Sequence, residues 1–184
     1  MNYWIIGTII VVVILILWVI LTYNKLIKLR NSVEDQWSQI DVQLKRRFDL
    51  IPNLVETVKG YAAHEKDTLE AVIAARNSFA AASTPEAEME ANNQISGALA
   101  RLFALSESYP DLKANTAFID LQNQLKETEN KIAFARQFYN DIVLKYKNAI
   151  EMFPSNILSG IFGFKQKPFF EADRTERENV KVQF

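Results

Sequence analysis

The sequence contains no cysteine and a single histidine, and these two shortages remove several chemistries. Without cysteine there is no disulfide framework, no thiol nucleophile and no cysteine-ligated zinc site. Glycine and proline are also scarce, with five of each in 184 residues. Neither a P-loop nor a glycine-rich dinucleotide fingerprint occurs, so backbone cradles for phosphate are not expected. The lone His64 is followed by Glu65 but lacks the second histidine that a helical zinc motif requires.

Charge is absent from the first 24 residues, because the first Asp, Glu, Lys or Arg is Lys25. The stretch from Trp4 to Tyr23 holds about 20 apolar residues, enough to cross roughly 30 Å of hydrocarbon as a helix. A cleaved signal peptide is the alternative, but it would need a basic start and a small-residue cleavage site. We therefore predict a membrane anchor over residues 1–24, with the following side chains at lipid or headgroup level: Trp4, Ile5, Ile9, Val13, Leu17, Trp18 and Tyr23.

The basic residues beside this anchor predict its orientation. Lys25, Lys28 and Arg30 follow the apolar stretch directly, whereas no basic side chain precedes it. Positive residues stay on the cytoplasmic side of a membrane. We therefore expect the N-terminus outside and the rest of the chain in the cytoplasm.

Beyond the anchor, apolar residues recur at steps of three and four, the spacing of one helical face. The four expected helices cover about 24–61, 65–82, 84–108 and 118–153. Pro52 is expected to kink the first helix or to start a fresh turn. Thr84 and Pro85 supply a capping hydroxyl and a first-turn proline for the third helix. Because the connections are short, we predict an all-α antiparallel four-helix bundle over 25–154, with a long first and a long fourth helix.

The fourth helix has the clearest apolar face. Its inward positions are predicted to be Phe118, Leu121, Leu125, Thr128, Ile132, Ala135, Tyr139, Ile142, Tyr146, Ala149 and Phe153. A coiled-coil-like face of this length covers about 50 Å, more than the second and third helices can shield at about 27 and 36 Å. The uncovered part predicts a second copy of the chain as one possible partner.

The C-terminal part, residues 155–184, begins with an apolar and aromatic tail. If the fourth helix returns toward the membrane, this tail reaches the headgroups. It then either packs on the base of the bundle or lies in the membrane interface. The candidate membrane-proximal residues are Ile161, Phe162, Phe164, Phe169 and Phe170.

Several long sequence words resemble the LemA family of bacterial membrane proteins. The words are WSQIDVQLKRR, DLIPNLV and VKGYAAHE between Val33 and Arg76, and DLKAN, a Q-x-Q-L word and FP-x-N between Asp111 and Pro154. The resemblance covers nearly the whole chain, with a small departure at Tyr146-Lys147, where Tyr-Asn is expected. It implies a membrane-anchored antiparallel helical bundle in the bacterial inner membrane, and it carries no established reaction.

The polar residues within these words are the candidate site. Their simplest interpretation is a solvated helix face, and the competing one is a partner surface or a polar network between helices. Acidic residues of the fourth helix, Glu127 and Glu129, could supply the opposite charges. The candidate residues are Asp41, Gln43, Arg46, Arg47, Asp49, Arg76, Glu129 and Arg136.

Taken together, these features predict a non-enzymatic scaffold or adaptor held at the lipid bilayer, with other membrane proteins or itself as partners. No metal, cofactor, nucleic acid or small-molecule substrate is expected. The alternatives are a homo-oligomeric membrane assembly and a metal-binding or catalytic helical bundle.

Overall fold

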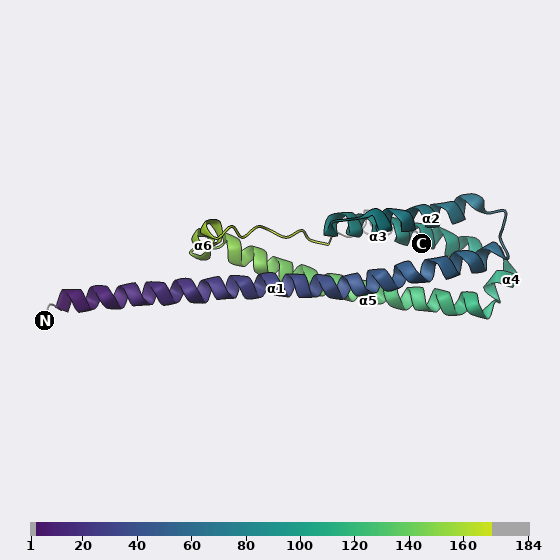
Figure 1. Cartoon of the computed structure of the whole chain (residues 1–184). Coiled ribbons are helices and arrows are strands. Elements are labelled where there is room, and N and C mark those ends of the chain that lie inside the picture. The colour runs from purple at the N-terminus through teal and green to yellow at the C-terminus, as the bar shows by residue number, and fades with distance from the viewer. Residues whose placement is uncertain (1–2, 171–184) are drawn as a thin grey trace, which may run out of the picture. The chain divides into compact units, whose positions relative to one another are not determined.

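The computed structural model describes residues 3–170, and every regular element within that range is a helix (Figure 1). The helices are α1 (Tyr3–Lys59), α2 (Lys66–Ala81), α3 (Pro85–Ser106), α4 (Pro110–Lys113), α5 (Thr116–Glu151) and α6 (Ser155–Ile161). The predicted all-α class with a long apolar first helix is confirmed. The up-and-down order of a four-helix bundle stays a prediction.

Contacts group the described residues into two units. The first unit comprises 3–38 and 137–169, and the second comprises 39–136 with Phe170. Because α1 and α5 each pass through both ranges, each unit contains one segment of both helices.

The second unit is built around an apolar core to which α1, α2, α3 and α5 all contribute. The core includes Ile51, Leu54, Val58, Leu69, Val72, Ile95, Leu99, Leu102, Phe118 and Leu125. Leu112 of the short α4 joins the same cluster. Four helix faces with a period of three and four thus enclose one interior, as the sequence pattern predicts.

Most helix ends lie within about two residues of their expected positions, and their causes can be identified. The Thr84 hydroxyl accepts a hydrogen bond from the Ala87 amide at 3.2 Å, and Pro85 occupies the first turn of α3. The turn α4 was not predicted, because its four residues are too few to show a helical period. Phe153 was wrongly placed in the apolar face of the fourth helix: α5 ends at Glu151, and Phe153 is 80% exposed.

The helix α1 continues through Pro52, so no separate helix begins there, and the alternative expectation of a kink at this residue stays a prediction. On α2, the large apolar side chain of Ile73 is exposed, whereas the small Ala75 is buried. Small side chains such as alanine allow two helices to approach closely, which the apolar pattern alone does not show.

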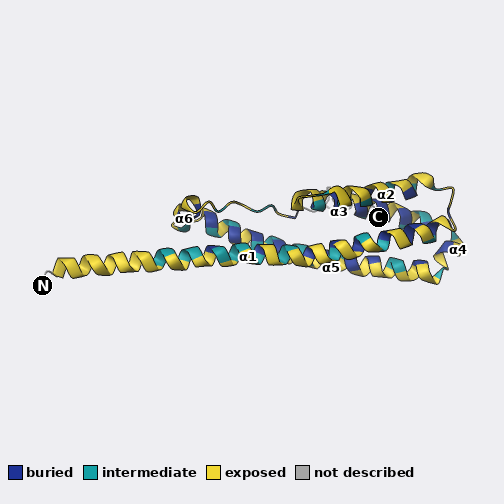
Figure 2. Ribbon diagram, viewed as in Figure 1, coloured by how far each residue is buried: buried dark blue, intermediate teal, exposed yellow. Residues whose placement is uncertain are grey.

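In the first unit, the burial of the α1 side chains changes along the helix (Figure 2). The side chains of 3–17 are exposed on every side, whereas Leu26 and Val33 are buried. The α5 segment of this unit buries Tyr139, Val143, Tyr146 and Ile150 at steps of three and four. The start of α1 is the one described helix long and apolar enough to cross a membrane.

Candidate functional site

The second unit contains a buried guanidinium, that of Arg47 on α1, whose side chain is 4% exposed. Its Nη1 donates hydrogen bonds to Asn92 Oδ1 at 2.8 Å and to Ser96 Oγ at 3.0 Å, both on α3. Its Nη2 lies 2.8 Å from Glu129 Oε2 on α5. One arginine therefore links three helices, which is the kind of fork geometry that lysine cannot reproduce.

Burial lowers the pKa of the Arg47 guanidinium, and the neighbouring Glu129 carboxylate opposes this by raising it. Arginine stays charged in proteins, so the network holds a cation inside the unit at all ordinary pH values. Arg47 Nε has no hydrogen-bond partner among the described residues. The Arg47 side chain is buried while that of Glu129 is 43% exposed, and desolvation of the guanidinium offsets part of its attraction to the carboxylate.

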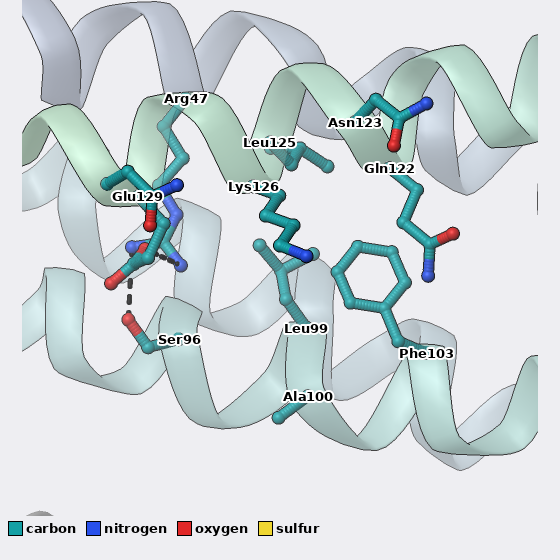
Figure 3. A pocket seen from close by; sticks show the side chains of 11 residues that line it. Arg47, Ser96, Leu99, Ala100, Phe103, Gln122, Asn123, Leu125, Lys126 and Glu129 are labelled. Carbon is teal, nitrogen blue, oxygen red and sulfur yellow. Dashed lines mark hydrogen bonds and ion pairs between the residues drawn. The ribbon is translucent and has the colours of Figure 1, made fainter.

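A groove with a cavity volume of about 470 Å³ opens beside this network, between α3 and α5 (Figure 3). Arg47 and Glu129 lie at one end, and Phe103 and Gln122 at the other. Lys126 reaches across the middle, over Leu99. The groove thus offers an apolar floor with polar groups along its rim.

The other predicted polar positions of α1 face outward or meet neighbouring helices singly. Arg46 lies 4.0 Å from Glu127, and both side chains are about half exposed. Asp41 is close enough to Glu88 of α3 for its charge to raise the pKa of that carboxyl, after the larger effect of burial. Gln43 is half-buried and Asp49 exposed. The candidate residues therefore lie at several separate places and do not line one common pocket.

Arg76 of α2 has a separate role, because it compensates for a hydrogen bond that Pro52 removes from α1. A proline at position 52 has no amide hydrogen, so the carbonyl of Phe48, four residues earlier, loses its helical donor. Arg76 Nε donates to that carbonyl oxygen at 3.3 Å. Its guanidinium also lies over the Phe48 ring, 3.8 Å from the centroid. The arginine replaces the missing hydrogen bond and adds a cation–π contact.

The aromatic tail of the first unit packs against the end of the apolar stretch of α1. The Tyr23 ring lies 4.8 Å from that of Phe162 and 5.9 Å from that of Phe164. Further along, the Tyr139 hydroxyl donates to the Pro168 carbonyl at 2.9 Å. Lys147 lies 6.0 Å from the Phe169 ring centroid. The tail segment is thus fixed to both α1 and α5 within this unit.

The remaining predicted residues are placed as follows. Arg136 lies 5.8 Å from the ring centroid of Phe170, which is buried in the second unit. Ile161 is exposed, as are the anchor residues Trp4, Ile5, Ile9, Val13 and Leu17, whereas Trp18 and Tyr23 are half-buried. No cluster of metal-ligating side chains occurs within 3–170.

Comparison with known proteins adds a family to this geometry. The LemA family matches residues 36–184. The chain belongs to the LemA family. Among its relatives, Protein LemA of Metamycoplasma hominis is 24% identical over 158 residues, which cover 85% of this chain and 72% of that protein.

Two further relatives of this LemA protein are named for magnetosomes. Magnetosome protein MamQ 2 of Paramagnetospirillum magneticum is 26% identical over 186 residues, covering 87% of this chain and 68% of the relative. Magnetosome protein MamQ of Magnetospirillum gryphiswaldense is 24% identical over 177 residues, covering 82% and 65%. The family and the apolar start of α1 together indicate a LemA-type membrane protein, anchored through its N-terminal helix.

The helical periodicity of the LemA sequence carries a signal for the buried arginine. Arg47 is three residues after Leu44 and four before Ile51, so it occupies a position on the apolar face of α1. Burying a charge at such a position costs much free energy unless hydrogen bonds or an ion pair compensate for the lost water. Its acceptors Asn92 and Ser96 were not predicted, because single polar residues on an amphipathic helix do not reveal which of them turns inward.

Proposed function

We propose that this LemA protein is a non-enzymatic scaffold that holds a helical docking surface at the cytoplasmic face of the bacterial inner membrane. The observation that carries the proposal is the continuity of α1. It runs from Tyr3 to Lys59 and joins an apolar stretch of membrane-spanning length to the interior of a helical domain. A single helix thus connects the anchor to the domain with no separate linker segment between them.

The groove beside Arg47 supports the docking half of this proposal. Its floor is apolar at Leu99 and Phe103, and its rim carries Lys126 and Glu129. Interfaces of transient complexes combine an apolar centre with a polar edge in this way. The partner we expect is therefore a protein segment with an apolar residue flanked by charged ones.

The orientation follows from Lys25, Lys28 and Arg30, which come directly after the apolar stretch. Positively charged flanks stay in the cytoplasm. A reporter fused after Phe184 tests this: one that works only in the cytoplasm is expected to be active, and one that works only after export is expected to be silent. The opposite pair of results contradicts the orientation while leaving the anchor intact.

The docking surface is tested by photo-crosslinking in native membranes. A photoreactive residue at position 126, in the groove, is expected to capture a different protein. The matched control is position 45, another exposed lysine that does not line the groove. Capture from position 126 of a second copy alone supports the homo-oligomeric assembly instead. No capture, or equal capture from both positions, contradicts the docking surface.

A further inference from the structure

The segment that follows α5, residues 152–162, exposes an unusual amount of apolar surface; it contains α6 and is called the α5–α6 turn below. Five large side chains within eleven residues are between 50% and 80% exposed: Met152, Phe153, Ile157, Ile161 and Phe162. Scattered apolar residues are ordinary on a protein surface, but a contiguous group of this size marks a binding surface for protein or lipid.

This turn is held in one conformation by contacts on its inner side. Leu158 is buried, and the Ser159 hydroxyl donates to the Ile150 carbonyl at 2.6 Å. Phe162 packs on Tyr23, as described above. The apolar side chains are therefore presented outward by an ordered element.

The turn also lies beside the end of the anchor within the same unit. A hollow of about 290 Å³ is lined by Trp18 and Thr22 of α1 and by Met152, Pro154 and Ser155 of the turn. Trp18 precedes Tyr23 by five residues, or about 7.5 Å along a helix. The turn therefore overlaps the last part of the stretch that spans the bilayer, and does not stop at its edge.

We propose that the α5–α6 turn is a second membrane-contact element, which inserts its exposed apolar side chains into the leaflet where the anchor ends. The proposal rests on the membrane anchoring in the proposed function. Interfacial segments bury their apolar face about 5–10 Å into the headgroup region, which matches the overlap with Trp18 and Tyr23. The exposed Lys25, Lys28 and Lys165 of the same unit suit anionic headgroups.

A lipid surface accounts for this turn better than a second copy of the chain. The apolar side chains continue the apolar surface of α1, whose residues 3–17 are exposed all round. One bilayer covers both surfaces at once, whereas a second copy would cover the turn and leave the anchor unexplained.

The absence of cysteine makes the test direct, because a single introduced cysteine is the one labelling site. The full chain is reconstituted in vesicles of phosphatidylcholine and phosphatidylglycerol, with a nitroxide on Phe153→Cys, Ile157→Cys or Phe162→Cys. Collisions with oxygen, which concentrates in lipid, are compared with collisions with a water-soluble nickel chelate. Oxygen is expected to dominate at all three positions.

Two further positions calibrate the measurement. Val13→Cys lies in the anchor and should report lipid. Phe138→Cys is an aromatic position that is 62% exposed and about 21 Å along α5 from Met152, and it should report water. Circular dichroism of each variant confirms that the helices are retained.

The outcomes separate this proposal from the one on which it rests. Turn positions that behave like Phe138, with Val13 in lipid, overturn the second contact and leave the anchor intact. Val13 in water overturns the anchoring as well. Spin–spin broadening at the turn that grows with the protein-to-lipid ratio shows a second copy there, and also overturns the proposal.

Discussion

The second unit of this LemA protein and the start of α1 in the first unit treat apolar side chains in opposite ways. In the second unit leucines are enclosed, as Leu102 is at 1% exposure, and even a guanidinium is held inside. In the first unit the Leu15 side chain is 55% exposed, and all the other side chains of residues 3–17 are exposed as well. The hydrophobic effect favours burial only where water is the alternative. The comparison therefore indicates that two different media surround the two parts of one chain.

The largest expected difference comes from the same truncation made in both units. Leu102→Ala should destabilise the helical domain by about 2–5 kcal/mol, because it leaves a cavity in the core. Leu15→Ala should leave the unfolding of that domain unchanged, since the side chain contacts no core residue. Denaturant unfolding of the full chain in lipid nanodiscs, followed by circular dichroism, measures both. Equal shifts would show that the exposed leucine also belongs to the folded core.

A smaller difference is expected between two acidic residues of α5, which separate a buried pair from an exposed one. Glu129→Ala removes the carboxylate 2.8 Å from the buried Arg47 guanidinium, and leaving a buried polar group short of a partner costs about 1–3 kcal/mol. Glu127→Ala removes the exposed partner of Arg46 and Lys131 and should have little effect. Urea unfolding of both variants decides the matter. A Glu129→Ala variant as stable as the Glu127→Ala variant would mean that Asn92 and Ser96 satisfy Arg47 alone.

The link between Arg76 and Pro52 predicts a coupling of about 1 kcal/mol, the value of one hydrogen bond. Arg76→Met should destabilise the domain when proline occupies position 52. In a Pro52→Ala background the new amide can donate to the Phe48 carbonyl itself, so the same substitution should cost less. A double-mutant cycle measures this difference. Strictly additive effects would show that the arginine acts through the Phe48 ring instead.

The smallest expected effect is that of pH on Glu88. Burial, and then the charge of Asp41, raise the pKa of this carboxyl in the folded state. The stability that Glu88 contributes to the folded state is therefore fully present below its unfolded pKa of about 4.3. It is lost as the pH rises through the higher pKa of the folded state. Glu88→Gln should raise the melting temperature slightly at pH 7 and not at all below about pH 4.

The neighbouring Glu90→Gln is the control for this measurement, because Glu90 is exposed on the same helix. A Glu88→Gln variant that is less stable than the parent at pH 7 would contradict the raised pKa.

Much of the fold could be predicted because helical periodicity is a local property. The apolar steps from Phe118 to Tyr146 name most of the buried positions of α5, although Val143 is buried where Ile142 was expected. Thr84-Pro85 marks the start of α3 within one residue. Arg47 was named as a candidate, and Glu129 as a possible partner, from charge alone. Arg47 and Glu129 can meet only if α1 and α5 turn these two side chains toward each other. Helical periodicity already restricts which face of each helix points inward.

The rest depends on contacts between residues far apart in the sequence. Nothing around Pro52 shows that Arg76, 24 positions later, will bond to the Phe48 carbonyl. In the same way, the ends of α5 and α6 do not show which aromatic residue Tyr23 will meet. Such contacts follow from how helices pack, and packing depends on small residues such as Ala75 that carry little pattern.

The unbroken course of α1 has a consequence for angular phase. Each residue of a helix turns the side-chain direction by about 100°. The direction of the Tyr23 side chain is therefore fixed relative to those of Leu26 and Val33, which follow it in the same helix. One residue inserted after Asn24 would turn the anchor by that angle and point Tyr23 away from Phe162. Seven inserted residues would restore the direction to within about 20° but shift it by about 10 Å. Within the first unit, the apolar start of α1 and the buried part of the same helix therefore cannot be rotated independently.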